Sequence, residues 1–408
     1  MERTAASSSR KSLSKTRLGR VRDGLADCVE RGEVPGLVAV VSRGGETHVE
    51  AMGALAFGGA PVRRDSVFRI SSMTKPITAV ATMILVEECK LRLDDAVDAW
   101  LPELADRRVL RAIDAAIEDT VPAERAITVR DLLTFRLGYG MLMAMPGTYP
   151  IQRAAAALGL DSGPPAPATV PPGDAWLAKL GTLPLMYQPG DRWLYNMGSE
   201  LLSILIERAA GQAFPAFLRA RIFEPLGMKD TGFFVPEAQI DRLATSYWPQ
   251  PDGSLTVYDE GRGGQWSRPP AFASGAAGLV STADDYLAFA RMLLAGGTHE
   301  GQRILSRPSV ELMTTDHLTP AQKARSGFTP EDFAASGFGF GVSVVTRRDH
   351  AYTPIGQYGW DGGLGSVWRN DPQEDMITLL FTQRMWSSPQ PPPVCRDFWT
   401  LAYQAVDD

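Results

Sequence analysis

The spacing of apolar positions changes twice along this 408-residue chain. Strand-like runs lie near the N-terminus, a mostly helical pattern extends from Ala96 to about Arg208, and strand-like runs return beyond Ser336. In the helical part, residues 127–133 form a clear segment for which Thr128 is a candidate N-cap. Strands at both ends around a helical middle predict one α+β unit that is interrupted by a helical insertion. The predicted strands are 37–42, 47–54, 67–70, 339–346, 365–368 and 376–383, and the predicted first and last helices are 17–31 and 396–406.

The predicted boundaries follow from this division. Residues 1–15 are rich in Ser, Lys and Arg and lack the apolar stretch of a secretory signal, so we expect a flexible polar tail. Residues 16–408 are expected to form a single domain. Its α/β lobe would consist of about 16–95 and 335–408, and its helical lobe of about 96–334.

One stretch after the first strands combines a helical pattern with reactive side chains. Residues 68–70 are typical of a short buried strand, and apolar positions after Lys75 predict a helix to about Cys89. Residues three apart share a helix face, so the Ser72 hydroxyl is predicted to lie beside the Lys75 amine. The first helical turn also leaves backbone N–H groups unpaired and carries partial positive charge, which favours an oxyanion. The stretch therefore indicates a serine acyl hydrolase.

The Ser-x-x-Lys spacing is a weak signal alone, because residues 8–11 and 12–15 also match it. A second stretch, residues 188–197, supports the pair at 72 and 75. There a Pro-Gly turn leads through Tyr195 into a predicted helix over 199–210, so the tyrosine hydroxyl could point into a cleft. A half-buried tyrosine with a purely structural role is the alternative.

A third stretch, residues 358–366, contains closely spaced glycines within a strand pattern. Such glycines usually mark a close approach of another backbone or of a ligand. The backbone N–H of Gly363 could then face that of Ser72 and complete a two-donor oxyanion hole. A glycine-rich hairpin bend is the alternative.

Composition narrows the class of function. Hydrophobic residues make up 44% and charged residues 22%, as in an ordinary globular protein. The formal net charge of −6 argues against nucleic acid or an anionic membrane surface as a partner, and no apolar run reaches the roughly 18 residues that would cross a bilayer. The cysteines are few and odd in number, which favours structural thiols in the cytoplasm over a disulfide framework; they are Cys28, Cys89 and Cys395.

Together the three stretches resemble the serine β-lactamase and penicillin-binding protein superfamily, specifically its class C-like branch, and within it the family VIII carboxylesterases. The resemblance covers about residues 20–400 and includes residues 127–134 and 275–286. It implies a β-lactamase/transpeptidase-like α+β fold, in which a central antiparallel sheet is flanked by helices and carries a mostly helical inserted lobe.

The resemblance also implies site residues. Ser72 would be the nucleophile, Lys75 and Tyr195 the paired general base and acid, and Trp360-Asp361-Gly362 would take the place of the Lys-Thr-Gly strand motif. Burial lowers the pKa of a lysine amine so that it can accept a proton, and a tyrosine can pass a proton to a leaving alkoxide. The expected oxyanion hole consists of the Ser72 and Gly363 N–H groups, and the expected substrate contacts are Trp360, Asp361 and Gly362.

Two departures from the family pattern bear on the substrate. Met197 stands where the lactamase-type Tyr-x-Asn has asparagine, and Trp360-Asp361 replaces the cation and hydroxyl of Lys-Thr-Gly. An indole and an acid disfavour a β-lactam carboxylate, so a neutral ester is the expected substrate. As the alternative, Trp360 packs in the core and Asp361 bonds to backbone.

Other functions remain open. A β-lactamase, a D-amino peptidase or an acyltransferase could use the same site, and a non-catalytic binding protein could share the scaffold. No GxSxG, HExxH, P-loop or GxGxxG pattern occurs, so no metal or other cofactor is expected. The expected partner is a small-molecule ester, without nucleic acid or membrane. The proline-rich residues 145–190 form either a lid or a surface insertion.

Overall fold

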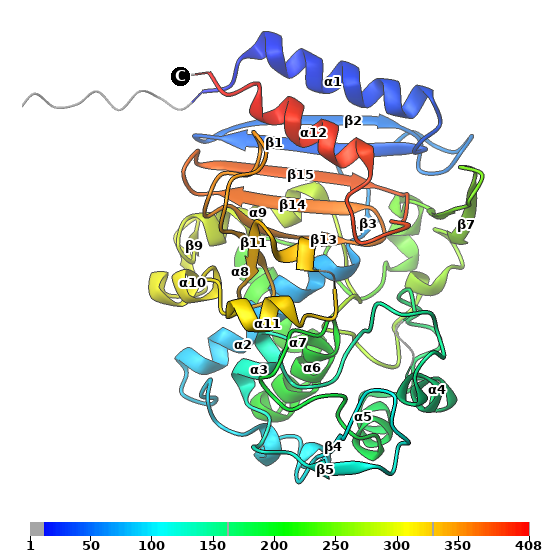
Figure 1. Cartoon of the computed structure of the whole chain (residues 1–408). Helices are drawn as coiled ribbons and strands as arrows, with labels where there is room; N and C mark the ends of the chain where they lie inside the picture. The colour runs from blue at the N-terminus through cyan, green and yellow to red at the C-terminus, as the bar shows by residue number, and fades with distance from the viewer. Residues whose placement is uncertain (1–11, 161–162, 329, 408) are drawn as a thin grey trace, which may run out of the picture.

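A seven-stranded antiparallel sheet forms the centre of the computed structural model, which describes residues 12–160, 163–328 and 330–407 (Figure 1). The strand order β11-β12-β13-β14-β15-β1-β2 places strands from the two ends of the chain side by side, so the predicted α+β fold with a central antiparallel sheet is confirmed. The strands are β1 (Gly36–Arg43), β2 (Glu46–Gly53), β11 (Ser336–Phe338), β12 (Ser343–Val345), β13 (Tyr358–Gly362), β14 (Ser366–Asp371) and β15 (Met376–Thr382).

Helices cover both faces of this sheet. Side chains alternate between the faces along a strand, and every residue of β1 is buried because both of its faces pack against apolar layers. On one face, Leu37 and Val41 join a core with α1 (Lys15–Glu30) and α12 (Pro393–Tyr403), which lie side by side across the sheet in Figure 1. On the other face, Val38 and Val40 belong to the large core that contains α2 (Thr74–Glu87) and α9 (Ala283–Leu294).

The described part of the predicted N-terminal tail is packed against the C-terminus. Residues 1–11 of that tail lie outside the described residues. Leu13 is buried and forms a β-bridge with Val406, and Ser12 Oγ donates a hydrogen bond to the Asp407 carbonyl at 2.8 Å. Residues 12–13 and 406–407 therefore lie side by side.

Short helices and two-stranded ladders build the rest of the molecule. The helices are α3 (Val129–Leu133), α4 (Pro150–Ala157), α5 (Gly173–Thr182), α6 (Met197–Ala210), α7 (Phe214–Leu218), α8 (Glu224–Leu226), α10 (Arg307–Met313) and α11 (Pro320–Ala324). The ladders pair β3 (Phe68–Arg69) with β8 (Val280–Ser281), β4 (Arg108–Leu110) with β5 (Thr120–Pro122), β6 (Ser246–Pro249) with β7 (Leu255–Asp259), and β9 (Thr298–His299) with β10 (Gln302–Arg303). Among the helices of the described ranges, none alone has the length and apolar character to cross a membrane; only α6 together with residues 214–226 meets both criteria, with a 79° bend between them.

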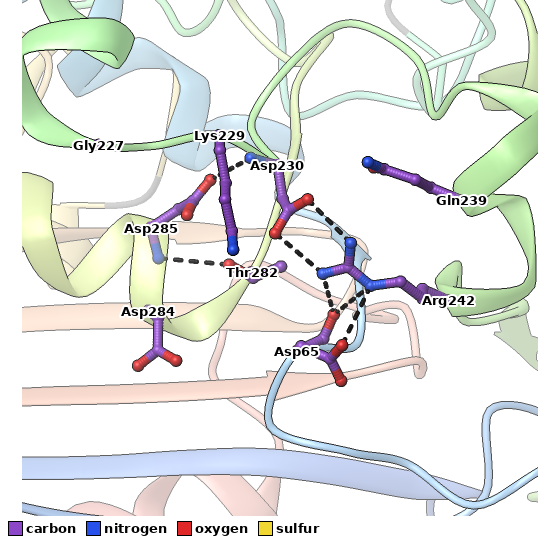
Figure 2. Close-up of a pocket in the computed structure, with 9 residues that line it drawn as sticks. All are labelled: Asp65, Gly227, Lys229, Asp230, Gln239, Arg242, Thr282, Asp284 and Asp285. Carbon is purple, nitrogen blue, oxygen red and sulfur yellow. Dashed lines mark hydrogen bonds and ion pairs between the residues drawn. The ribbon is translucent and has the colours of Figure 1, made fainter.

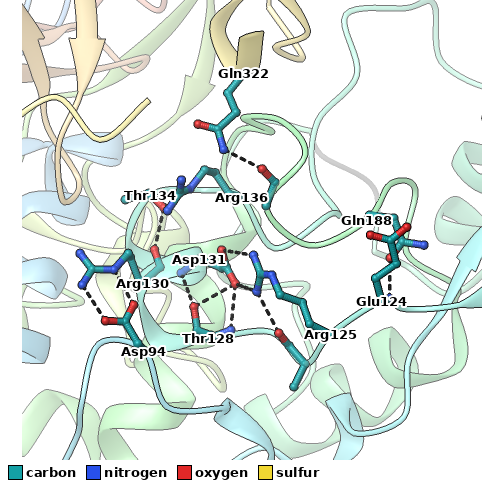
Figure 3. A network of polar contacts seen from close by, with 12 residues as sticks. Asp94, Glu124, Arg125, Thr128, Arg130, Asp131, Thr134, Arg136, Gln188 and Gln322 are labelled. Carbon is teal, nitrogen blue, oxygen red and sulfur yellow. Dashed lines mark hydrogen bonds and ion pairs between the residues drawn. The ribbon is translucent and has the colours of Figure 1, made fainter. Parts of the chain in front are cut away.

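The predicted N-cap of α3 is present (Figure 3). Thr128 Oγ1 accepts a hydrogen bond from the Asp131 N–H at 3.2 Å, and the Asp131 carboxylate accepts one from the Thr128 N–H at 3.0 Å. This reciprocal pair is a capping box. Arg125 bonds to both oxygens of the same carboxylate, so the start of α3 is fixed to the preceding loop.

The predicted single strand over 339–346 is wrong, because the chain turns back within it. Gly341 has φ +72°, a left-handed conformation that favours glycine, and it separates β11 from β12. A Cβ at this position would lie 2.9 Å from the Lys75 carbonyl oxygen. The turn between β11 and β12 therefore packs closely against the first turn of α2.

The proline-rich residues 145–190 contain α4 and α5 and pack against residues between 249 and 278. Tyr258 OH donates to the Pro165 carbonyl at 2.8 Å, and the rings of Trp176 and Phe272 lie 5.4 Å apart. The described parts of the segment are thus supported by residues almost one hundred positions away. Its role as a lid stays a prediction.

Candidate active site

Ser72 and Lys75 lie on one face at the start of α2, as their spacing predicts. Strand β3 leads into a 3₁₀ turn at Ser71–Met73, in which Ser71 has φ +45°, an uncommon conformation for a residue with a Cβ. Lys75 Nζ donates hydrogen bonds to Ser72 Oγ and to the Ala276 carbonyl, both at 2.8 Å. The lysine side chain is fully buried, whereas Ser72 is partly exposed. A reagent from solvent can therefore approach the hydroxyl but not the amine.

Tyr195 meets this pair from the turn before α6. Its OH donates to Ser72 Oγ at 2.7 Å, and its ring centroid lies 4.5 Å from Lys75 Nζ. The next residue, Asn196, has φ +104° and ends the extended segment, while Met197 is buried as the first residue of the helix. The structure therefore brings the three predicted catalytic side chains, from two distant segments, around one oxygen atom.

Trp360 on β13 completes the polar contacts of the tyrosine. Its Nε1–H donates to Tyr195 OH at 3.2 Å, and its ring lies 5.3 Å from that of Phe338. Both rings belong to an aromatic cluster that also contains Phe135 and Trp193. The indole is thus a neutral hydrogen-bond donor to the phenol, held in place by neighbouring rings.

The end of β13 lies against the residue that precedes the Ser71–Met73 turn. A Cβ on Gly362 would be only 2.2 Å from the Ile70 carbonyl oxygen, so only glycine permits this approach. Gly363 follows it and is exposed to solvent, and a Cβ added there would meet no other heavy atom within 4 Å. This arrangement brings the predicted partners of the oxyanion hole to the same end of the strand; their joint use stays a prediction.

Asp361 lies on the opposite side of β13 from Trp360, as expected for neighbours in a strand. Both of its carboxylate oxygens accept hydrogen bonds from Arg369, at 2.5 and 2.7 Å. The Arg369 guanidinium lies 4.7 Å from the Trp399 ring of α12, on the side of the sheet that carries the terminal helices. The structure therefore places Asp361 in an ion pair with Arg369, and its contact with substrate stays a prediction.

Burial shifts the pKa values of the candidate base and the candidate acid in opposite directions. Removal from water disfavours the charged amine and lowers the pKa of Lys75 to about 7, while the Glu200 carboxylate acts to raise it. Burial also raises the pKa of Tyr195 to about 12. Near neutral pH the lysine can therefore be an uncharged proton acceptor, while the phenol retains the proton it could donate.

Three residues of this site were not predicted from the sequence. The Ala276 carbonyl accepts the second hydrogen bond of Lys75, and Ser274 Oγ donates to Glu200 Oε1 at 2.8 Å. Glu200 lies on α6, five positions after Tyr195. This closeness in the sequence was the one signal that could have associated Glu200 with the site. The partner at 274 is far away in the chain, so the sequence pattern offered no reason to join it to the site.

A separate polar cavity of about 390 Å³ is lined by none of the predicted site residues (Figure 2). Its charges are largely paired with one another: Arg242 bonds to both carboxylate oxygens of Asp230, and the Asp285 carboxylate accepts from the Asp230 N–H. Across the described ranges, no group of three or more His, Cys, Asp or Glu side chains could hold a metal ion. The cavity therefore offers no chemistry that competes with the arrangement around Ser72.

Comparisons with known proteins identify the family of the chain. A family model described as Beta-lactamase matches residues 21–393. Protein Rv1367c of Mycobacterium tuberculosis is 40% identical over 330 residues, which cover 80% of this chain and 79% of that protein. Esterase EstB of Burkholderia gladioli is 30% identical over 369 residues, which cover 85% of each chain. The solved structure of EstCE1, a hydrolase with promiscuous acyltransferase activity, matches with a TM-score of 0.77 at 25% identity, over 95% of this chain and 99% of that one. The resemblance predicted from the three stretches is confirmed.

Proposed function

The chain belongs to the beta-lactamase family of serine hydrolases, and on that premise we propose that it hydrolyses small neutral carboxylic esters through an acyl-enzyme on Ser72. The observation that carries the proposal is the convergence on one oxygen atom. Ser72 Oγ receives hydrogen bonds from Lys75 Nζ at 2.8 Å and from Tyr195 OH at 2.7 Å. A hydroxyl held between a base and an acid has the geometry that nucleophilic catalysis requires.

The proposed reaction uses these groups in turn. The uncharged Lys75 amine takes the Ser72 proton while Oγ bonds to the ester carbonyl carbon, whose oxygen becomes an anion. The N–H groups of Ser72 and Gly363 would stabilise that oxyanion. As the bond to the alcohol breaks, the leaving oxygen takes the proton of Tyr195, which recovers a proton from the Lys75 ammonium. Water then attacks the carbonyl carbon of the acyl-enzyme, and the same groups pass protons in the opposite direction. Ser72 regains its proton as the acid is released.

Charge at the site supports a neutral substrate. The position where the family motif has a lysine carries Trp360, which supplies a neutral donor, and Asp361 is neutralised by Arg369. A substrate carboxylate would therefore meet no unpaired cation at this strand. The free-energy cost of removing its hydration would not be offset by a new interaction. The similarity to EstB, which is named an esterase, also supports an ester over a β-lactam.

The test is mass spectrometry of the intact protein after exposure to a fluorophosphonate, together with turnover of a short p-nitrophenyl ester. We expect one covalent adduct on Ser72, and no adduct and no turnover in Ser72→Ala. Tyr195→Phe should lower kcat by about 10²-fold or more with KM nearly unchanged. Ser12→Ala is the matched control, because residues 12–15 have the same Ser-x-x-Lys spacing but pack at the C-terminus.

Two outcomes would refute the proposal. Ester turnover that survives in Ser72→Ala would exclude this hydroxyl as the nucleophile. Rapid, stoichiometric acylation of Ser72 by a penicillin, without measurable ester turnover, would favour a penicillin-binding or β-lactamase role over an esterase.

A further inference from the structure

We propose that Glu200 is a positioning residue of this site, which anchors the loop that holds Lys75 and compensates the positive charge that Lys75 gains from the Ser72 proton. The inference rests on the proposed function, because it assigns Lys75 as the base. It concerns a side chain that lies outside the three stretches that define the family likeness. A chain of hydrogen bonds links Glu200 to Lys75, and the Glu200 carboxylate is buried with only one of its oxygens accepting a hydrogen bond.

The loop at residues 274–277 is clamped between α2 and α6. Thr78 Oγ1 on α2 donates to the Gly275 carbonyl at 2.7 Å. From the other side, a Cβ on Gly275 would lie 2.5 Å from the Ser199 carbonyl oxygen of α6, so the loop passes too close to this helix for any side chain. The loop therefore cannot shift without moving one of the two helices that carry the site.

Glu200 fixes the same loop through Ser274. Ser274 Oγ donates to Glu200 Oε1 at 2.8 Å and accepts hydrogen bonds from the N–H groups of Ala276 and Ala277, at 3.3 and 3.0 Å. The carbonyl of Ala276 in turn accepts the hydrogen bond of Lys75 Nζ. A continuous chain of hydrogen bonds thus runs from the carboxylate to the amine, and the amine points at Ser72 Oγ.

The second carboxylate oxygen, Glu200 Oε2, is buried and has no hydrogen-bond partner in the described part of the chain. A buried carboxylate without full pairing is costly unless a positive charge lies near it. Burial raises the pKa of Glu200, and the hydrogen bond from Ser274 and the positive charge of Lys75 both oppose that shift. The other titratable groups around the pair are Tyr195, which keeps its proton, and Asp361, which is bound to Arg369.

The charge of Glu200 matters most during the reaction. When the Ser72 proton moves to Nζ, a buried neutral amine becomes a buried ammonium, which is unfavourable in a site of low dielectric constant. A carboxylate held nearby offsets this cost without touching the substrate or the reacting atoms. Glu200 would therefore affect the rate of acylation and its pH dependence, and not the affinity for the ester.

The experiment compares Glu200→Gln, Glu200→Asp and a matched control, Glu207→Gln, two turns further along α6. Glutamine retains an oxygen that can accept from Ser274 but has no charge. We expect kcat to fall about tenfold, with KM within twofold, and an acid limb of kcat/KM that moves to lower pH because the lysine loses its counter-charge. The aspartate variant should recover part of kcat, and the control should match the wild type.

A direct titration separates this inference from the proposed function. The pKa of Lys75 is measured by NMR in protein with ¹³C- and ¹⁵N-labelled lysine, with the signal assigned by its absence from Lys75→Met. A lower Lys75 pKa in Glu200→Gln supports the inference whether or not the protein hydrolyses esters. An unchanged pKa and an unchanged acid limb would overturn it, even if esterase activity is found. If Glu200→Gln does not fold, the same shifts in Glu200→Asp, smaller in size, decide the question.

Discussion

Replacement of Gly362 by alanine tests the packing that brings β13 to the nucleophile. In Gly362→Ala the added methyl group would lie 2.2 Å from the Ile70 carbonyl oxygen and 2.3 Å from Ser366 Oγ. The serine hydroxyl can rotate away, but the carbonyl is backbone and belongs to the residue directly before the Ser71–Met73 turn. Ordinary contact begins at 3.4 Å, so the strand end and the turn must separate by about 1 Å.

This displacement has two measurable consequences. Overpacking of a buried contact costs about 1–3 kcal/mol of unfolding free energy, which lowers the melting temperature by a few degrees in a domain of this size. A shift of about 1 Å between a nucleophile and the groups that orient the substrate can reduce the rate by about 10²-fold. We therefore expect activity to fall by far more than the modest loss of stability would produce.

The assay is kcat/KM for a p-nitrophenyl ester together with a thermal melt. Gly19→Ala is the control: it also adds a methyl group, on α1, where nothing lies within 4 Å, so it should retain wild-type activity and a melting temperature no lower than that of the wild type, because alanine is the better helix former. Gly363→Ala should keep the wild-type melting temperature, because its added methyl group also meets no atom. Wild-type activity and stability in Gly362→Ala would show that β13 does not approach residue 70 this closely.

Three further predictions follow from individual contacts. Trp360→Phe keeps an aromatic ring but removes the hydrogen bond to Tyr195 OH. Because such a hydrogen bond contributes about 0.5–1.5 kcal/mol, kcat should fall about 2- to 10-fold with little change in KM. An unchanged kcat would contradict a role for the indole N–H. Arg69→Met leaves the buried Asp259 carboxylate unpaired and should cost about 3–5 kcal/mol in urea unfolding, part of which a second change, Asp259→Asn, should restore. Ester hydrolysis should rise with pH through about 7 as the Lys75 amine loses its proton, with no loss from Tyr195 ionisation below about pH 12; a pH–rate profile without this rise would exclude the amine as the base.

Features that depend on local patterns were predictable from the sequence. The helix that carries Ser72 and Lys75 follows from apolar spacing, and their mutual contact follows from a separation of three residues. The N-cap at Thr128 follows from the preference of a threonine hydroxyl for unpaired N–H groups at a helix start. The sheet was also predictable in outline, because β1 and β15, near the two ends of the chain, are rich in apolar residues and buried throughout.

Features that depend on side-chain direction or on distant partners were harder to predict. Trp360 and Asp361 were both expected to contact substrate, although neighbours in a strand point to opposite faces; the alternation rule alone would have separated them. Glu200 and Ser274 are 74 positions apart and meet only because α6 and the 274–277 loop pack together. No periodicity in either segment records that contact.

The replacement of a cation by Trp360 also has a consequence for the end of the reaction. A lysine at this strand position would leave two positive groups near Tyr195, and these would favour an anionic ligand. In this chain Lys75 has Glu200 as its counter-charge, Asp361 is paired with Arg369, and the phenol is bound by an uncharged indole. A carboxylate released by the proposed ester hydrolysis would therefore find no unpaired cation at β13 to retain it. Weak inhibition by the acid product is the expected result, because binding it would require an anion to give up its hydration without a partner.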